Sequence, residues 1–383
     1  MDYTQLKKDM IELRHDIHNH PEAAFEEVRT SKIVAEKLRS WGYEVTEGLG
    51  KTGVVGVLKN GEGPRIGLRA DMDCNPITET ADIPYASTTE HRMHSCGHDG
   101  HTVTLLGAAK ILAETKPFKG TVILVFQPAE EPGYGAAAMI KDGLFEKFPM
   151  DEIYGQHNFN YFDKGEMGIC VGPCMAAEDN FFIKIHGVGG HASGPHKTKD
   201  PIVIGAEVVM ALQTIVSRNV DPLKQAVVSC TEFRTDGAHN AIPSNCEIDG
   251  DCRSYDPEVS KQIEARMGQI VKSICEMNDA DYEFKYTREF IPTINDKTCA
   301  EWAAKAAAVV LGGEEKVLLG CNPVMGSEDF AHYLQHVPGC FAFLGNIDET
   351  HNLPNHHGKY DFNDDLLLPG AKWFVELISQ RMA

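Results

Sequence analysis

The sequence predicts an α/β protein with a mixed, largely parallel sheet, flanking helices and an inserted α+β domain. In the first and last parts of the chain, amphipathic helical stretches alternate with short apolar strands, an order that favours a parallel sheet. Between about residues 180 and 290 the pattern changes to longer strands with two long helices. The length of 383 residues also exceeds what one core usually supports. We therefore predict one domain formed by residues 1–178 and 291–383, and a second domain formed by residues 179–290.

The first part of the chain begins with two expected helices, because apolar residues recur at helical spacing up to Pro21 and again before Gly42. The turn Asn60-Gly61-Glu62-Gly63 lies between two apolar runs, which we expect to pair as neighbouring strands. The expected helices are 6–17, 26–41 and about 101–112, and the expected strands are 54–58, 65–68, 121–126 and 153–155.

The inserted part and the C-terminal part follow from the same patterns. The insert is expected to contain strands 181–186, 226–233 and 246–253 and helices 201–216 and 258–277. From about Pro292 the α/β pattern resumes, with a helix over 298–311, a strand over 340–344 and a final helix from Leu366.

The composition is that of a soluble globular protein, with 42% hydrophobic and 24% charged residues. The 36 Lys and Arg against 56 Asp and Glu give a net charge of −20, which repels polyphosphate and argues against a nucleic-acid partner. We find no signal-peptide core at the beginning and no run of about 18 apolar residues, so we expect no membrane span. The eleven cysteines are an odd, scattered set, which favours a reducing cytoplasm over a disulfide framework.

The run His94-Ser95-Cys96-Gly97-His98-Asp99-Gly100-His101 places five side chains that bind metal or carry protons within eight residues. Its two glycines favour a loop, and a loop can direct both Cys96 and His98 at one ion. The alternative is a buried thiol with structural histidines. For His94 and His101 we expect support of the ligands rather than direct metal binding.

Two adjacent carboxylates, Glu130 and Glu131, follow the apolar strand 121–126. Neighbouring residues in an extended segment point in opposite directions, so one carboxylate can bind a metal while the other takes a proton from water. The alternative is a solvated acidic turn, which is common in so acidic a chain. The position directly after a hydrophobic strand disfavours that alternative.

Further histidines occur in the second half of the chain. His157 follows the short strand 153–155, and the loop His351-Asn352-Leu353-Pro354-Asn355-His356-His357-Gly358 holds three histidines with no Lys or Arg among them. Such a loop is unusual for a plain surface, although a flexible polar loop is the alternative. Thiolate, imidazole and paired carboxylates together suit a borderline divalent metal and a water-activating base. The sequence therefore predicts a metallohydrolase.

Seven motifs follow one another over essentially the whole chain. They are Arg69-Ala70-Asp71-Met72-Asp73, the Cys96 run, Gln127 to Glu131, Gly189-Gly190-His191-Ala192, Asn240-Ala241-Ile242-Pro243, Gly326-Ser327-Glu328-Asp329-Phe330 and Tyr360-Asp361-Phe362-Asn363-Asp364. In this order the chain resembles an M20-type metallopeptidase of the amidohydrolase branch. That branch includes hippurate hydrolases, N-acyl-amino-acid amidohydrolases, auxin-conjugate hydrolases and N-acetyldiaminopimelate deacetylases.

The resemblance implies a zinc-exopeptidase-like catalytic domain that holds two divalent metal ions per subunit. Zn, Mn, Co and Ni all suit such mixed ligands. Glu130 would be the general base, and Cys96 would be shared between the two ions, where more distant relatives carry a bridging Asp. The implied ligands are Cys96, His98, Glu131, His157 and His356.

The resemblance also implies that the inserted domain is a lid and a dimerisation domain, so that the protein is a homodimer or homotetramer. His191 would polarise the scissile carbonyl in the neighbouring subunit's site, while Asn240 and Arg253 would bind the substrate carboxylate. Without the resemblance, His191 is equally well explained by a tight turn and Arg253 by a surface ion pair.

Two departures from the family pattern concern the substrate pocket. The usual Leu-His-x-Pro is replaced by Asn355-His356-His357-Gly358, where counting back from Tyr360 favours His356 as the ligand over His357 or His351. The usual Ala-Leu-Pro after Asp73 is replaced by Cys74-Asn75-Pro76, which alters the expected pocket wall.

The expected reaction is metal-dependent hydrolysis of the amide bond of N-acyl-L-amino acids, with hippurate-like conjugates first. Alternatives in the same family are N-acetyldiaminopimelate deacetylation and carboxypeptidase or dipeptidase activity. A non-catalytic metal-binding module is disfavoured because a binder needs no second carboxylate beside the ligand. A structural zinc protein is disfavoured because Cys-x-x-Cys pairs are missing.

Overall fold

A computed structural model describes all 383 residues and divides the chain into two compact units. Unit 1 consists of Met1–Cys174, Ile294–Pro323 and Glu328–Ala383, and unit 2 consists of Met175–Thr293 and Val324–Ser327. The short return of Val324–Ser327 to unit 2 has no counterpart in the expected organisation.

Unit 1 is built on an eight-stranded sheet with the order β1-β2-β4-β3-β5-β16-β6-β15. Four of the seven strand pairings are parallel and three are antiparallel, which confirms the prediction of a mixed, largely parallel sheet. The strands are β1 (Glu44–Leu49), β2 (Gly53–Asn60), β3 (Arg65–Asp71), β4 (Gly120–Gln127), β5 (Glu152–Asp163), β6 (Met167–Ile169), β15 (Val317–Leu319) and β16 (Gly339–Ile347).

The prediction that β2 and β3 pair with each other is wrong. β4 lies between them, antiparallel to β2 and parallel to β3. The reason is burial: from Ile66 to Asp71 every residue of β3 is buried, so β3 needs neighbouring strands on both edges and cover on both faces. The turn at 60–63 therefore carries the chain past one strand instead of closing a hairpin.

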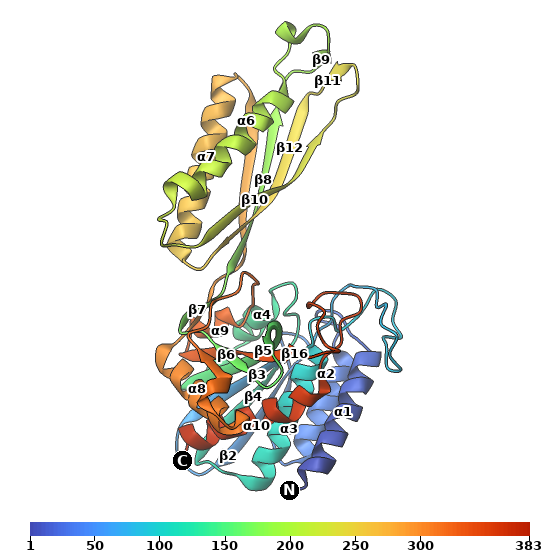
Figure 1. Cartoon of the computed structure of the whole chain (residues 1–383), viewed down its shortest axis with the longest axis vertical. Helices are drawn as coiled ribbons and strands as arrows, with labels where there is room; N and C mark the ends of the chain where they lie inside the picture. The colour runs from blue at the N-terminus through green and yellow to red at the C-terminus, as the bar shows by residue number, and fades with distance from the viewer. The chain divides into compact units, whose positions relative to one another are not determined.

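Helices cover both faces of this sheet (Figure 1). α1, α2, α3, α8 and α10 share one apolar core with residues of the first face, such as Val54 and Leu68. On the second face Met139 of α4 accepts a hydrogen bond from the hydroxyl of Tyr333 in α9, while Phe330 packs against Phe341 of β16. The helices are α1 (Tyr3–Asn19), α2 (Val28–Ser40), α3 (His98–Thr115), α4 (Gly135–Lys141), α5 (Leu144–Lys147), α8 (Lys297–Leu311), α9 (Ala331–Leu334) and α10 (Leu367–Arg381), with 3₁₀ turns η3 (Glu314–Lys316) and η4 (Asp364–Leu366).

α1 is fastened to α3 by a buried ionic contact. His18 contacts Asp99 at 2.8 Å and Glu79 at 3.2 Å, and Arg14 lies 3.5 Å from the same Asp99. Burial by itself lowers the pKa of His18, but the charge of Asp99 and the hydrogen bonds with Asp99 and Glu79 outweigh it and raise the pKa to about 9.

His18 is therefore expected to stabilise the protein in a pH-dependent way. Because its pKa rises from 6.5 to about 9 on folding, its contribution is complete below pH 6.5 and is lost as the pH rises through 9. The shift corresponds to about 3 kcal/mol. The difference in Tm between wild type and His18→Gln, measured in chelator, should be largest below pH 6.5 and shrink towards pH 9. The exposed His20→Gln variant is the control, and an equal pH-dependent loss in it would contradict the assignment.

Unit 2 is a four-stranded antiparallel sheet, β10-β12-β8-β13, whose apolar core is completed by α6 and α7. Its elements are β8 (Ala177–His186), β9 (Gly190–His191), η1 (Pro195–Lys197), α6 (Pro201–Thr214), η2 (Ile215–Asn219), β10 (Ala226–Thr235), β11 (Ala241–Ile242), β12 (Asn245–Ser254), α7 (Pro257–Met277) and β13 (Asp281–Phe290). A small separate sheet pairs β7 (Gly172–Met175) with β14 (Thr293–Asn295).

One helical segment, Pro201–Asn219, is long and apolar enough by composition to cross a membrane, although only a third of it is buried. The segment is not an unbroken apolar run, because Glu207 and Gln213 interrupt it. One face of the segment packs into the core of unit 2 through Ile204, Val208 and Leu212, which explains its apolar character without a membrane.

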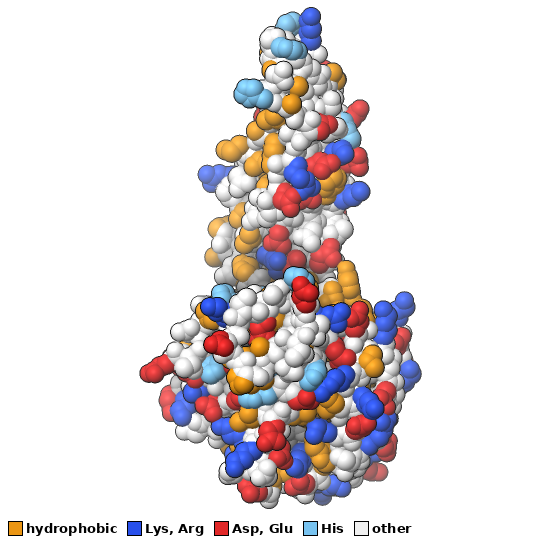
Figure 2. All heavy atoms as spheres, turned by 90° about the vertical axis from the view of Figure 1, so that its right-hand side faces the viewer, with side chains coloured by type: hydrophobic (Ala, Val, Ile, Leu, Met, Phe, Trp, Pro, Cys, Tyr) orange, Lys and Arg blue, Asp and Glu red, His pale blue; other side chains and the backbone are white.

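The opposite face of α6 exposes further apolar side chains, among them Ile202, Val203 and Met210. On the face of the molecule drawn in Figure 2, apolar side chains of unit 2 are exposed, and charged side chains of both signs are interspersed over the surface. Exposed apolar side chains on one helix are typical of a contact surface.

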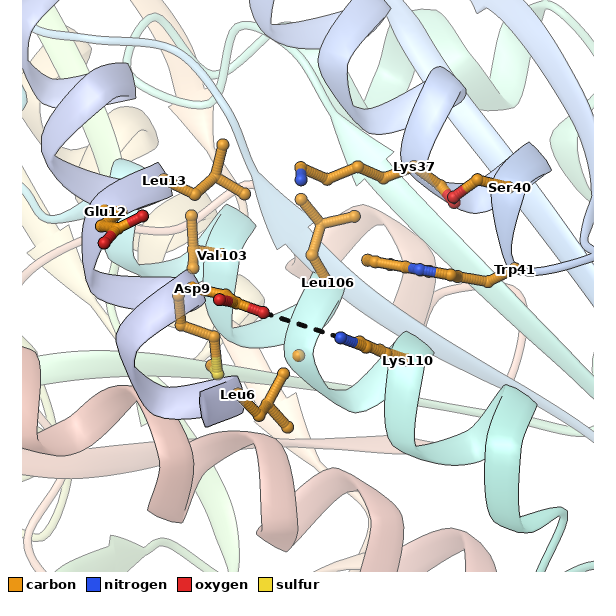
Figure 3. Close-up of a pocket in the computed structure, with 12 residues that line it drawn as sticks. Leu6, Asp9, Glu12, Leu13, Lys37, Ser40, Trp41, Val103, Leu106 and Lys110 are labelled. Carbon is orange, nitrogen blue, oxygen red and sulfur yellow. Dashed lines mark hydrogen bonds and ion pairs between the residues drawn. The ribbon is translucent and has the colours of Figure 1, made fainter. Parts of the chain in front are cut away.

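A groove of about 490 Å³ lies between α1, α2 and α3 (Figure 3). Leu13, Leu106 and Trp41 form apolar walls, and Lys110 lies 3.7 Å from Asp9 beside them. None of the predicted site residues lines this groove. The predicted site residues of unit 1 therefore lie outside this groove.

Candidate metal centre

The predicted site residues of unit 1 gather at the carboxyl ends of β3 and β4 and at the neighbouring part of β5. β3 pairs in parallel with both β4 and β5, with Asp71 opposite Gln127 and Arg69 opposite Gly155. The segments after β3 and β4, and His157 two residues beyond Gly155, therefore reach one edge of the sheet. Ligand sites of α/β sheets lie at this edge.

His157 was expected just beyond a short strand, but it lies inside β5, opposite Phe343 of β16. The helix predicted to begin at His101 begins three residues earlier, so His98 is the first residue of α3 instead of a loop residue. Gly97 precedes it with φ +93°, and a Cβ there would meet the Asn158 side chain at 2.4 Å. Only glycine therefore allows the chain to pass from Cys96 into α3 so close to β5.

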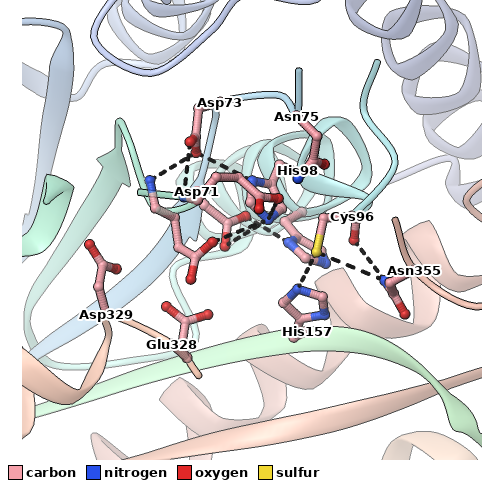
Figure 4. A network of polar contacts seen from close by, with 12 residues as sticks. Asp71, Asp73, Asn75, Cys96, His98, His157, Glu328, Asp329 and Asn355 are labelled. Atoms are coloured by element: carbon pink, nitrogen blue, oxygen red, sulfur yellow. Dashed lines mark hydrogen bonds and ion pairs between the residues drawn. The ribbon is translucent and has the colours of Figure 1, made fainter. Parts of the chain in front are cut away.

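The structure brings the five predicted ligands together in overlapping groups, drawn in part in Figure 4. Cys96, His98 and His157 form one group, and Cys96, Glu131 and His356 form another, with the ligand atoms of each group within 4.8 Å of one another. Cys96 is common to both. The Cys96 Sγ lies 3.3 Å from His157 Nε2, and His356 Nε2 lies 3.5 Å from a Glu131 oxygen.

The donor atoms fit a divalent cation. His98 Nε2 and Glu131 Oε1 lie 3.7 Å apart, and both are buried without a hydrogen-bond partner. Buried polar atoms are almost always satisfied, so a pair of unsatisfied ones that face each other indicates a missing partner. Thiol, imidazole and carboxylate donors are the set that Zn²⁺ and its neighbours prefer.

The Nδ1 atoms of two predicted histidine ligands, which point away from the cluster, make hydrogen bonds within the protein. His98 Nδ1 donates to Asp73 at 3.3 Å, and His157 Nδ1 donates to the carbonyl oxygen of Asn158 at 2.7 Å. Both bonds leave the Nε2 atoms facing the cluster. His101 contacts Asp71 at 2.6 Å and Asn158 at 2.7 Å through its two nitrogens, and its supporting role stays a prediction, since Asp71, His98 and His101 also form a possible ligand group.

Asp73 organises the carboxylate pair, a role that the motif reading did not assign. Its two carboxylate oxygens accept hydrogen bonds from the backbone N–H groups of Glu130, at 3.0 Å, and Glu131, at 3.1 Å. One oxygen also accepts the bond from His98 described above. The same carboxylate therefore orients a ligand histidine and the segment that carries both glutamates. The sequence feature that could have indicated this role is the position of Asp73 two residues after Asp71, just beyond a buried strand.

The two glutamates have opposite electrostatic surroundings. Burial, together with the charges of Glu328 and Glu131, raises the pKa of Glu130 well above its ordinary value. Burial also opposes ionisation of Glu131, but the hydrogen bond with His356 and the charge of His98 lower its pKa. The Glu131 carboxyl thus favours the ionised form, while the Glu130 carboxyl holds a proton more readily.

A buried ionic network lies behind Glu130. Arg69 donates to Asp71 at 2.7 Å, Glu328 at 2.8 Å and Asp329 at 3.1 Å, and to Gln127 at 2.9 Å. Sequence reasoning quoted these residues as motifs and assigned them no role. The position of Arg69 directly after the apolar run Ile66 to Leu68 of β3 was the one visible signal, since buried arginine requires anionic partners.

The late histidine loop contributes one residue to the cluster. His356 adopts φ +65° and its backbone N–H donates to the Ser95 carbonyl at 2.8 Å, which brings its ring to Cys96 and Glu131. His351 pairs with Asp348 at 3.0 Å, and His357 accepts from the backbone N–H of Lys359. His94 is buried with neither ring nitrogen hydrogen-bonded, and burial lowers its pKa to about 3.

The three predicted residues of unit 2 do not lie together within that unit. His191 on β9 pairs with Ala241 of β11, directly after Asn240, at one end of the sheet. Arg253 lies at the other end of β12, where it contacts Glu178 at 2.8 Å, Asp251 at 3.0 Å and the Ser327 hydroxyl at 2.8 Å. The eight residue steps from Asn245 to Arg253 span about 26 Å of strand.

Fold and donor set are those of a metal-dependent hydrolase, because two adjacent carboxylates lie among side chains that could hold metal ions. Residues 67–380 match the model of the peptidase family M20/M25/M40. The chain therefore belongs to this family, and it is a metal-dependent amidohydrolase of the M20 type.

Known proteins resemble the chain over nearly its full length. It is 42% identical to the hippurate hydrolase of Campylobacter jejuni, over 97% of this chain and 96% of that protein. It is 38% identical to thermostable carboxypeptidase 2 of Saccharolobus solfataricus, over 97% and 94% of the two chains. The crystal structure of YXEP from Bacillus subtilis, described as a dinuclear metal-binding peptidase of the M20 family, matches with a TM-score of 0.86 at 31% identity, over 99% of both chains.

Proposed function

We propose that this enzyme hydrolyses the amide bond of N-acyl-L-amino acids, with hippurate-like conjugates as the preferred class, to a carboxylate and a free amino acid. The observation that carries the proposal is the pair of adjacent glutamates, which form one possible ligand group with His98 but have opposite pKa shifts; only Glu131 also belongs to the group with Cys96 and His356. Similarity to a hippurate hydrolase over nearly the whole chain supports the substrate class.

Two divalent ions would be held by Cys96, His98, Glu131, His157 and His356, with the Cys96 sulfur shared. The overlap of the two ligand groups at Cys96 supports this arrangement, as does the dinuclear relative. Mixed thiolate, imidazole and carboxylate donors suit Zn, Mn, Co or Ni. When bound, such ions polarise the amide carbonyl and lower the pKa of water.

Glu130 would then transfer the proton, while neighbouring residues position it. Glu130 accepts the proton of the attacking water and delivers it to the nitrogen of the leaving amine, which completes the cleavage. Its raised pKa means that it holds the transferred proton more readily than an ordinary carboxylate does. Arg69 and Asp73 keep the Glu130 segment in place.

His191 is proposed to donate a hydrogen bond to the carbonyl oxygen as negative charge develops on it. Its Nδ1 accepts from the backbone N–H of Ser193 at 3.1 Å, so the proton resides on Nε2, the atom that faces outward as a donor. Asn240 and Arg253 are proposed to bind the substrate carboxylate. Because they occupy opposite ends of unit 2, we propose that His191 and Asn240 act in the site of a second copy of the chain.

The substrate proposal is tested by a screen that varies acyl group and amino acid independently, with and without chelator. We expect chelator-sensitive release of free amino acid from benzoyl and other aromatic or short acyl conjugates. If the enzyme cleaves only N-acetyldiaminopimelate, or only peptides, the proposed substrate class is wrong and one of these alternatives within the family takes its place. Peptides are included in the screen because a carboxypeptidase is among the relatives. Metal analysis of the purified protein identifies the ions.

Participation of a second copy is tested by mixing two inactive variants, Glu130→Gln and His191→Ala. In a homodimer where His191 acts across subunits, half of the sites in a mixed dimer recover both groups. Equal mixing with full exchange should then restore about a quarter of wild-type activity. The apolar face of α6 supports such association. No recovery, with exchange of subunits verified by mass spectrometry, would show that His191 acts within its own chain.

A cytoplasmic location of the protein stays a prediction.

A further inference from the structure

Glu27, in the loop before α2, is a fully buried carboxylate that has no part in the reaction described above. One of its oxygens accepts hydrogen bonds from the backbone N–H groups of Ala129, at 2.9 Å, and Phe25, at 3.0 Å. Its other oxygen accepts from the Thr52 hydroxyl. Glu27 thus links the loop before α2 to the residue that immediately precedes the catalytic glutamates.

Ala129 has an unusual backbone conformation. Its φ of +50° lies in the left-handed region, which residues other than glycine rarely adopt, and its side chain is fully buried. The next two N–H groups, of Glu130 and Glu131, are held by Asp73, but that of Ala129 is held by Glu27 alone. Glu27 therefore fixes the Pro128–Ala129 peptide, while the next peptide is held at the Ala129 carbonyl by the Gly135 N–H, at 2.9 Å, and at the Glu130 N–H by Asp73.

We propose that Glu27 is a positioning residue for the reaction: its carboxylate holds Ala129 in the left-handed conformation and thereby aims Glu130 at the reacting water and Glu131 at the metal ions. This inference rests on the roles proposed for Glu130 and Glu131. Burial, with a smaller effect of the Asp73 charge, raises the pKa of Glu27 to about 7. Keeping a carboxylate in such surroundings is unfavourable, which argues for a specific task.

A neighbouring carboxylate provides a matched control. Glu22 accepts from the backbone N–H groups of Arg29 and Thr30, both at 2.8 Å, and so caps the start of α2. It resembles Glu27 in binding two N–H groups of the same region. It accepts no hydrogen bond from the segment that carries Glu130.

The test compares Glu27→Ala, Glu27→Gln and Glu22→Ala, each checked for folding by circular dichroism. In Glu27→Ala we expect kcat to fall about 100-fold, as for a misplacement of roughly 1 Å, and KM to change less than about threefold. Glu27→Gln should retain most of the activity, because its amide oxygen still accepts from Ala129. Glu22→Ala should lower Tm without changing kcat.

A rescue variant separates positioning from general loss of stability. Glycine adopts a left-handed conformation without strain, so adding Ala129→Gly to Glu27→Ala should restore kcat about tenfold. If Glu27→Ala does not fold, Glu27→Asp, whose shorter side chain no longer reaches Ala129, should show a smaller loss of the same kind with the same rescue.

A second readout does not depend on the substrate. Competition with a chromophoric zinc chelator should show metal binding weakened about tenfold in Glu27→Ala, because Glu131 is displaced as well, and unchanged in Glu22→Ala. If the wild type cleaves no N-acyl amino acid, the proposed function fails while this comparison still decides the role of Glu27. Equal kcat and equal chelator competition in Glu27→Ala and Glu22→Ala would overturn the inference.

Discussion

Replacing Glu130 with glutamine is expected to lower kcat by about three orders of magnitude while leaving both metal ions bound. The amide is nearly the same size as the carboxyl group but cannot accept the proton of water. The contacts that hold this segment are made by the Glu130 and Glu131 backbone N–H groups and therefore remain. Turnover of hippurate and metal content per chain, measured on the same sample, check the expectation.

Glu131→Gln is the matched control, since it changes the adjacent carboxylate in the same way. We expect it to lose metal, because Glu131 belongs to the groups formed with Cys96 and His356 and with His98. If Glu130→Gln loses metal and Glu131→Gln does not, the two roles are exchanged. If Glu130→Gln turns over at nearly the wild-type rate, Glu130 is not the base.

Replacing Cys96 with alanine is expected to abolish the binding of both metal ions and with it all detectable hydrolysis. Cys96 is the one residue common to the group with His98 and His157 and the group with Glu131 and His356. A ligand shared by two ions supports each of them, so its removal weakens both sites together. Mass spectrometry under native conditions gives the number of ions per chain.

Cys96→Asp separates the loss of a shared ligand from the loss of a buried side chain. A carboxylate can also bridge two ions, so this variant should retain metal and part of the activity, with a preference shifted towards harder ions such as Mn²⁺. Retention of one ion per chain in Cys96→Ala would mean that the sulfur belongs to a single ion. The shared role would then be withdrawn.

Much of the fold follows from local patterns. The amphipathic positions of α1 and the apolar runs of β4 and β16 are recognisable because each element repeats its own period. The order of strands is a different matter. Pairing of β2 and β3 was predicted from a turn, but the fully buried β3 requires neighbours that lie far away in the sequence, and nothing local encodes them.

The site divides in the same way. Cys96, His98, Glu131, His157 and His356 stood out because soft and acidic donors clustered in glycine-rich or post-strand segments. Residues that position other side chains through hydrogen bonds are not recognisable from the sequence. In the sequence, Asp73 and Glu27 cannot be told apart from other acidic residues. Only the structure shows which backbone N–H groups donate hydrogen bonds to their carboxylates. Arg69 drew no role because its partners Glu328 and Asp329 are some 260 positions away along the chain.

The wide separation of Arg253 from His191 and Asn240 along unit 2 has a kinetic consequence. If each site borrows groups from another copy, specific activity must fall when the enzyme is diluted below the concentration at which copies associate. The loss would be reversible on concentrating the sample and would occur with every metal ion still in place. Assays at nanomolar and micromolar enzyme would then report different values for the same preparation.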